Sequence, residues 1–143
     1  MSNPAPSHTE IDVVKNQYSD RDYLVKISIP EFTCICPRTG HPDCAIIEID
    51  YIPDALIVEL KSLKLYLQGF RNMGIFHEAV TNKIIDDFRL ACKPRKVDVV
   101  GRFNPRGGIS TDVEVVTVIS LNINETGFEF WIDHEAIINK IIN

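Results

Sequence analysis

The sequence contains no apolar run long enough to span a bilayer, and no signal-peptide pattern stands at its start. It also has no excess of positive charge, since the formal net charge is −5 and the isoelectric point is about 5.3. These absences argue against a membrane protein and against a nucleic-acid-binding protein that relies on phosphate contacts. Four cysteines without a secretory signal indicate free thiols in a reducing compartment, so we expect a cytoplasmic protein.

Internal repeats and low-complexity tracts are also missing, and so is the Gly-x-Gly-x-x-Gly fingerprint. Any binding of a nicotinamide dinucleotide would therefore not be of the Rossmann type. A length of 143 residues, 45% of them apolar, suits one domain with a substantial core. We expect a polar N-terminal arm, mobile or loosely docked, over residues 1–20 and a single domain over residues 21–143 that ends in a C-terminal extension.

Hydrophobic periodicity predicts four strands and two helices in the order strand, strand, helix, helix, strand, strand. The predicted ranges are 23–29, 45–51, the later half of 58–70, 77–92, 96–103 and 109–121. Pro30 is expected to end the first strand. This order predicts an α+β domain with a four-stranded antiparallel sheet and both helices on one face. The two sheet edges would be open to pairing, so we expect a homo-oligomer. Residues 129–142 are expected to form a short extended segment and an amphipathic helix.

The segment 32–43 gathers a thiol, an imidazole and a carboxylic acid around a short loop. Pro37 and Pro42 restrict the backbone on both sides of that loop. This arrangement predicts that Cys36 and Asp43 lie on its two shoulders, where both side chains can face one small target. A cysteine with an acid close by is a candidate nucleophile with a proton donor.

Two other interpretations of this segment stay open on the residues alone. Cys36 can be a buried, inert side chain, because a free cysteine packs as a small hydrophobic residue. A zinc site is also conceivable, although the spacing of its potential ligands is not a familiar finger pattern. Those ligands would be Cys34, Cys36, His41 and Cys44.

Four motifs, in this order along the chain, resemble those of the single-domain NADPH-dependent 7-cyano-7-deazaguanine reductases of queuosine biosynthesis. They are Cys-Pro-Arg-Thr-Gly-His-Pro-Asp at 36–43, Glu-Leu-Lys-Ser-Leu-Lys-Leu-Tyr at 59–66, Phe-His-Glu at 76–78 and Gly-Arg-Phe-Asn-Pro-Arg-Gly-Gly-Ile-Ser at 101–110. The resemblance covers about residues 29–110. It implies the tunnelling fold, whose strand-strand-helix-helix-strand-strand unit agrees with the order predicted above. It also implies an oligomeric barrel of pentameric rings, or a decamer, with active sites between subunits.

The resemblance implies reduction of the nitrile of 7-cyano-7-deazaguanine to a primary amine by two NADPH, with no metal. Cys36 resembles the nucleophile that forms a covalent thioimide with the nitrile carbon, and Asp43 resembles the proton donor. Thiol addition turns a poor hydride acceptor into a C=N group that protonation makes electrophilic. The substrate is a free base, so the resemblance implies neither a nucleic-acid nor a membrane partner.

The resemblance also implies two sets of binding residues, each of which has a simpler explanation. The substrate set consists of Val58, Glu59, Leu60, His77 and Glu78, and the simpler explanation for His77 and Glu78 is that they begin a helix, where acidic residues are common. Within it, the Glu78 carboxylate could accept two hydrogen bonds from a guanine-like edge. The NADPH-binding set would contact the phosphates of the cofactor, and the simpler explanation is that its members are ordinary charged side chains in solvent. It consists of Lys61, Lys64, Arg102 and Arg106.

Three rival functions remain compatible with the same residues. The nearest is an amidinotransferase that adds ammonia to the same nitrile and needs no NADPH. The lysine-bearing motif at 59–66 favours the reductase over it. The other two are a zinc-dependent cyclohydrolase-type enzyme of the same fold and a tunnelling-fold module that binds the base without chemistry.

Overall fold

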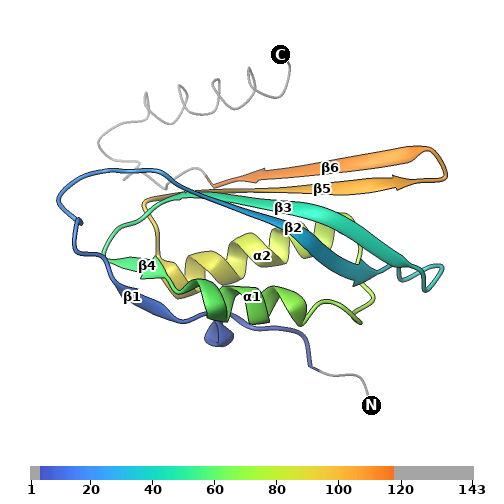
Figure 1. Cartoon of the computed structure of the whole chain (residues 1–143), viewed down its shortest axis with the longest axis horizontal. Coiled ribbons are helices and arrows are strands. Elements are labelled where there is room, and N and C mark those ends of the chain that lie inside the picture. The colour runs from blue at the N-terminus through green and yellow to red at the C-terminus, as the bar shows by residue number, and fades with distance from the viewer. Residues whose placement is uncertain (1–3, 118–143) are drawn as a thin grey trace, which may run out of the picture.

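The computed structural model describes residues 4–117, which form a four-stranded antiparallel sheet covered on one face by two helices (Figure 1). The sheet order is β2-β3-β5-β6, and a small second sheet pairs β1 with β4. Along the chain the elements are η1 (His8–Glu10), β1 (Val13–Lys15), β2 (Val25–Ile35), β3 (Pro42–Ile52), β4 (Leu56–Val58), α1 (Leu60–Gln68), α2 (His77–Cys92), β5 (Lys96–Arg106) and β6 (Ile109–Val116). The predicted α+β class and the order of its main elements are confirmed.

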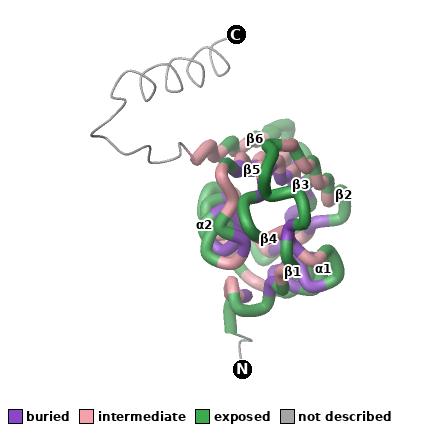
Figure 2. The backbone as a smooth tube through the Cα atoms, turned by 90° about the vertical axis from the view of Figure 1, so that its left-hand side faces the viewer, coloured by how far each residue is buried: buried purple, intermediate pink, exposed green. Residues whose placement is uncertain are grey.

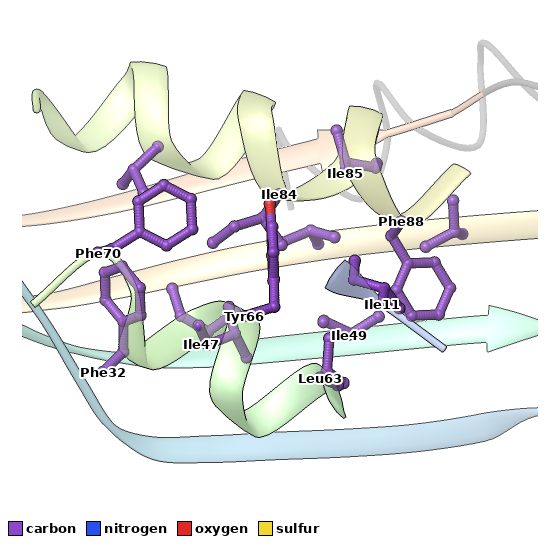
Figure 3. Packing of buried hydrophobic residues seen from close by; sticks show 14 of the residues in the cluster. Ile11, Phe32, Ile47, Ile49, Leu63, Tyr66, Phe70, Ile84, Ile85 and Phe88 are labelled. Atoms are coloured by element: carbon purple, nitrogen blue, oxygen red, sulfur yellow. The ribbon is translucent and has the colours of Figure 1, made fainter. Parts of the chain in front are cut away.

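The core lies between the sheet and the helices, where buried backbone positions gather (Figure 2). Along β3, Ile47, Ile49 and Tyr51 point inward, as their period-two spacing predicts. From α2, Ile84 and Phe88 point toward β3 (Figure 3). The ring of Phe88 lies 4.9 Å from that of Tyr51 in an edge contact. Burying each such side chain contributes ~1.5–3 kcal/mol, so this layer fixes α2 on the sheet.

The first predicted strand is longer than the sequence suggests. Pro30 does not end it, because β2 continues to Ile35 with a register shift between Ile29 and Phe32. β2 is an edge strand, where a proline without an N–H group is tolerated at a bulge. The expectation that Pro30 ends the strand is therefore wrong. The strand consequently reaches the loop that carries Cys36.

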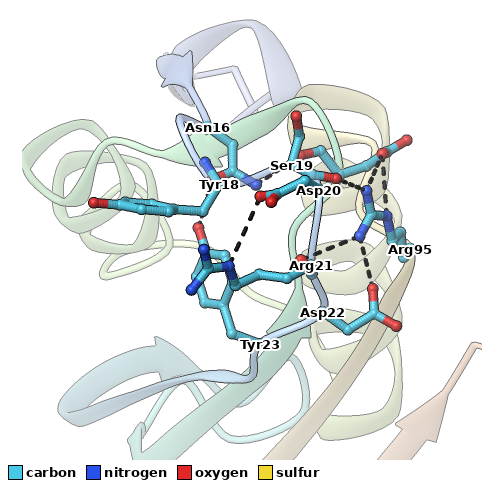
Figure 4. Close-up of polar contacts among 9 residues, drawn as sticks. Asn16, Tyr18, Ser19, Asp20, Arg21, Asp22, Tyr23 and Arg95 are labelled. Carbon is cyan, nitrogen blue, oxygen red and sulfur yellow. Dashed lines mark hydrogen bonds and ion pairs between the residues drawn. The ribbon is translucent and has the colours of Figure 1, made fainter.

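Residues 4–20 are packed on the domain rather than loosely attached. Ile11 joins the core, and β1 pairs with β4, a contact that the periodicity did not indicate. The guanidinium of Arg95 stabilises the turn at residues 18–21, which follows β1. It donates to the carbonyl of Ser19 and to the carboxylates of Asp22 and Asp54 (Figure 4). The end of the predicted strand 109–121 and the predicted segment 129–142 lie outside the described residues.

α1 and α2 differ in how their first turns are capped, and one buried hydrogen bond connects them. Glu59 caps α1, since its carboxylate accepts hydrogen bonds from the backbone N–H groups of Lys61 and Ser62. α2 begins at His77 without a side-chain cap. The hydroxyl of Tyr66 donates to the buried carboxylate of Asp87 at 2.6 Å and so ties α1 to α2. Within residues 4–117, no helix has the length and apolar character needed to cross a bilayer.

α2 approaches β5 most closely at Gly101. A Cβ atom there would lie 2.7 Å from Oγ1 of Thr81 and 2.9 Å from the ring of Phe103. Both neighbours are buried, so neither can move aside without disturbing the core. Glycine at this position lets the N-terminal half of α2 sit directly on the sheet.

We predict that Gly101→Ala lowers the free energy of unfolding by about 1–3 kcal/mol, because the added methyl group overpacks this contact. Urea unfolding measures the effect. Gly74→Ala is the matched control, since its Cβ would lie 3.8 Å from the nearest atom, in Pro37. Equal stabilities for the two variants would contradict the interpretation of Gly101.

Candidate active site

The loop between β2 and β3 closes as a tight hairpin with Cys36 and Asp43 on its shoulders. The N–H of Cys36 donates to the carbonyl of His41, and the N–H of Gly40 donates to the carbonyl of Cys36, both at 2.9 Å. Gly40 has φ of +72°, a left-handed conformation that favours glycine. The hairpin therefore fixes the thiol at the end of one strand and the acid at the start of the next.

The Cys36 thiol has a reactive environment. Its pKa is lowered, first by a hydrogen bond from the Thr39 side chain and then by the backbone N–H groups of Thr39 and Arg38. It is also partly exposed. Burial instead raises the pKa of Cys34 to about 12 and that of Cys92 to about 11. The thiolate is the nucleophilic form, so Cys36 differs chemically from these two buried thiols.

Asp43 is a buried carboxylate, 4% exposed, with two partners. Nη1 of Arg106 donates to its Oδ1 at 2.5 Å, and Nε2 of His77 lies 3.2 Å from its Oδ2. Burial raises the pKa of Asp43, but the hydrogen bonds from Arg106 and His77 outweigh it, and the pKa is lowered below its usual value. Asp43 is therefore ionised at neutral pH in this chain.

Three elements besides the hairpin position these partners. The first is the segment 73–75 before α2, which pairs with Ile35 of β2. The N–H of Ile35 donates to the carbonyl of Met73, and the N–H of Ile75 donates to the carbonyl of Ile35. This contact places His77, the first residue of α2, beside Asp43. The His77 ring then stacks on Phe103 of β5, with centroids 3.8 Å apart and planes at 7°. His77 is consequently held in one orientation by an aromatic face and a carboxylate.

Glu78 lies next to His77 in the first turn of α2 and is exposed. Among the contacts of residues 4–117, its carboxylate has no hydrogen-bond or ion-pair partner. The predicted residues Cys36, Asp43 and His77 therefore belong to one cluster of the same chain, and Glu78 follows His77 in the first turn of α2. Arg106 joins this cluster through Asp43 rather than standing free in solvent.

The structure does not bring Val58, Glu59 and Leu60 to this cluster. The backbone N–H of Val58 bonds to the hydroxyl of Tyr51 at 3.1 Å. Tyr51 is eight residues along β3 from Asp43, which is about 26 Å of strand. The two predicted groups thus lie at opposite ends of the sheet (Figure 1). The Glu59 carboxylate is moreover engaged as the cap of α1.

The four predicted phosphate ligands fall into two kinds. Arg102 is bound to Glu48 and Asp112, and Arg106 is bound to Asp43. Lys61 and Lys64, three residues apart on α1, are exposed and have no ion-pair partner within residues 4–117. Residues three apart share a face of a helix, so these two ammonium groups can meet one anion.

A groove of about 350 Å³ lies between the edge strand β2 and α1. Its walls are mostly apolar, and Leu60 and Lys64 stand on its α1 side. Leu60 is 61% exposed in the single chain. The groove therefore lies beside the predicted substrate segment at Leu60 and runs along β2 as far as Thr33, whereas Cys36 does not line it.

The described residues do not form a zinc site. Within 4–117, no three His, Cys, Asp or Glu side chains are placed to share a metal ion. Cys34 is fully buried whereas Cys44 is exposed, so these two thiols lie on opposite faces of the β2–β3 pair. The zinc interpretation consequently has no support in this part of the chain.

Sequence reasoning missed two residues that shape the cluster. They are Thr39, which the sequence places in the short loop after Cys36, and Phe103, which it places at the end of a predicted strand. Both lie inside the motifs at 36–43 and 101–110. A polar side chain three residues after Cys36 was the available signal for Thr39, whereas nothing local linked Phe103 to His77, because their stacking depends on the α2–β5 contact.

Comparison with known proteins agrees with this geometry. The family model described as QueF-like protein matches residues 42–120. A curated NADPH-dependent 7-cyano-7-deazaguanine reductase of Nitrosococcus oceani is 51% identical over 110 residues, which are 77% of this chain and 85% of that protein. A reductase of the same name from Elusimicrobium minutum is 58% identical over 100 residues, covering 70% and 75% of the two chains.

A solved structure is similar in fold. The crystal structure of the archaeosine synthase QueF-Like in the apo form aligns with a TM-score of 0.62 at 20% identity, over 66% of this chain and 92% of that one. The fold and the site together define an α+β protein with an activated cysteine beside a buried carboxylate. The chain belongs to the QueF-like protein family, and the resemblance drawn from the four motifs is confirmed.

We predict that Thr39→Val slows alkylation of Cys36 by iodoacetamide several-fold at neutral pH. Without the Thr39 hydroxyl the pKa of Cys36 rises, so less thiolate is present and alkylation requires a higher pH. Peptide mass mapping across a pH series separates the thiols. Thr39→Ser, which keeps the hydroxyl, should react as the unchanged protein does, and Cys44 provides an internal reference. A Thr39→Val protein that alkylates at the original pH would contradict this assignment.

Proposed function

We propose that this protein is an NADPH-dependent 7-cyano-7-deazaguanine reductase, which converts the nitrile to the aminomethyl group with two NADPH. The observation that carries the proposal is the pairing of the low-pKa thiol of Cys36 with the buried carboxylate of Asp43. The curated relatives bear the same name as the proposed activity. A cytoplasmic location suits a free base as substrate.

Cys36 and Asp43 suffice for the covalent step. The Cys36 sulfur adds to the nitrile carbon, one π bond of the C≡N group breaks, and a thioimide forms. The thiol proton must reach the nitrile nitrogen. An ionised Asp43 can take that proton from sulfur and return it to nitrogen, so that the step is balanced without solvent. Burial of Asp43 keeps competing water away from this exchange.

Two NADPH molecules, bound one after the other, would each supply one hydride. Lys61 and Lys64 fit the phosphates of NADPH best, because both are exposed and share a face of α1. Arg102 is the weakest member of the predicted set, since two carboxylates already engage it. Arg106 lies close enough to Asp43 to act at the reacting end of the site.

Recognition of the base is assigned to Glu78 and to residues of a second subunit. The exposed carboxylate of Glu78 can pair with a ring N–H and an exocyclic amine. Val58, Glu59 and Leu60 lie too far from Cys36 to touch the same molecule within one chain. We therefore propose that they complete the site of a neighbouring copy, as the predicted ring-shaped oligomer would allow. The open sheet edges β2 and β6 are available for such assembly.

Among the rival functions, the amidinotransferase would use the same thiol and nitrile. The named cofactor of the curated relatives and the exposed Lys61–Lys64 pair favour the reductase. A cyclohydrolase-type enzyme would need a zinc ion, for which the described residues offer no ligand group. A module that only binds the base would have no use for an activated thiol.

The first test follows NADPH absorbance after 7-cyano-7-deazaguanine is added to metal-free protein, with the product mass determined at the end. We expect two NADPH oxidised per aminomethyl product, and an adduct on the intact protein when NADPH is omitted. Cys36→Ala should abolish both signals, whereas Cys44→Ala, in the same hairpin, should keep them. Turnover by Cys36→Ala would refute the mechanism, and an adduct without NADPH oxidation would favour the amidinotransferase.

A mixing experiment tests the shared site. Cys36→Ala and Leu60→Trp should each be inactive alone, the second because a bulky side chain blocks the neighbour's site. Leu60 is exposed, so the chain itself tolerates the change. After unfolding and refolding of an equal mixture, about one quarter of the sites receive both intact halves, since each half is intact with a probability of one half.

The control mixture combines Cys36→Ala with Glu78→Gln. Both residues lie in the same half of the proposed site, so this mixture should recover nothing. Recovery in the control, or its absence in the first mixture, would contradict the assignment of the two halves.

A further inference from the structure

The proposed reaction places opposite demands on Asp43. Thioimide formation needs a carboxylate that can accept the thiol proton from Cys36. Each hydride added afterwards leaves a nitrogen that must take up a proton, so the reductive steps need a protonated acid at the same place. The overall balance is two hydrides and two protons per nitrile. The protonation state of Asp43 must therefore change between thioimide formation and the reductive steps.

Arg106 has the geometry to bring about this change. Its Nη1 donates to Asp43 at 2.5 Å and to the carbonyl of Pro42 at 3.4 Å. The other nitrogens of its guanidinium fork make no hydrogen bond to residues 4–117. The side chain is 34% exposed, and it stands directly before the Gly107–Gly108 turn, whose left-handed backbone only glycine adopts readily. An anion from solvent can thus reach a cation that already touches the buried acid.

The other groups that face Asp43 cannot respond in this way. They are His77 from α2, Cys34 from β2 and Cys36 from the hairpin loop, while Cys44 of β3 acts on Arg106 instead. His77 is clamped against Phe103, and Cys34 is fully buried. Cys36 and Cys44 carry no positive charge in either protonation state. Arg106 is a permanent cation with a planar fork that matches phosphate, so it is the partner of Asp43 that an external anion can draw away.

We propose, on the basis of the proposed function, that Arg106 is a positioning residue that links cofactor arrival to the proton chemistry of Asp43. With no dinucleotide present, Arg106 holds Asp43 ionised and ready to accept the thiol proton. When a phosphate of the dinucleotide engages the guanidinium, Asp43 loses its strongest hydrogen bond, takes up a proton from solvent and becomes the donor for the reductive steps, with a second proton taken up from solvent before the second hydride. The order of events then follows from competition between two anions for one guanidinium.

The inference is tested without turnover. The rate of adduct formation on Cys36, in the absence of any reductant, is measured by intact-protein mass from pH 4 to pH 8. Ionised Asp43 is needed for this step, so the rate falls on the acid side. Arg106→Gln should move that acid limb to higher pH and lower the rate at pH 5 about tenfold, the size expected for loss of one charged hydrogen bond. NADP⁺, which has the phosphates but no hydride to give, should shift the unchanged protein in the same direction and leave Arg106→Gln unaffected.

Arg89→Gln is the matched control, because it removes the same charge at the far end of α2. It should leave the acid limb in place. Carbon-13 NMR of the aspartate carboxyl groups, with Asp43 assigned from Asp43→Asn, follows the same titration without the nitrile. An acid limb and a carboxyl titration that NADP⁺ does not move would overturn the inference, even if Arg106→Gln weakens NADP⁺ binding. Absence of any adduct on the unchanged protein would instead overturn the proposed function, and the NMR titration would still decide the role of Arg106.

Discussion

The charged hydrogen bonds of one buried carboxylate hold the reactive end of this protein together. Asp43 on β3 binds Arg106 from β5 and His77 from α2, so three elements meet at a group that would otherwise be costly to bury. Their meeting requires α2 to lie directly on the sheet, which Gly101 permits. The site is thus a consequence of how closely the helix layer approaches the strands.

Much of this arrangement could be anticipated from the sequence, for identifiable reasons. α2 has the predicted bounds because its apolar stripe recurs at three- and four-residue spacing and Lys93 closes it in a left-handed conformation. The hairpin that carries Cys36 is predictable because Pro37 and Pro42 fix their own backbone angles and Gly40 permits a tight turn between them. These features are local, and local patterns are what a single sequence expresses most directly.

The rest depends on contacts between distant segments. The pairing of β1 with β4 involves three-residue strands, too short to show periodicity. The resemblance predicts a phosphate ligand at Arg106, and nothing near it in sequence reveals that Asp43 faces it. Glu59 illustrates the converse, because the same carboxylate that belongs to a substrate motif caps α1 here. A residue type indicates what a side chain is able to bind, whereas the fold selects the partner that it finds.

Thr39 and Arg106, which act on Cys36 and Asp43, lie at very different sequence distances from these two residues. Thr39 is three residues from Cys36, whereas Arg106 is 63 residues from Asp43. Short loops close within nanoseconds to microseconds, but long-range pairing waits for most of the domain. During synthesis, Cys36 is therefore expected to gain its activating hairpin well before Arg106 has left the ribosome. The nascent chain then carries an activated thiol without a finished catalytic site, which makes the interval before β5 docks the time when Cys36 is most exposed to unwanted oxidation.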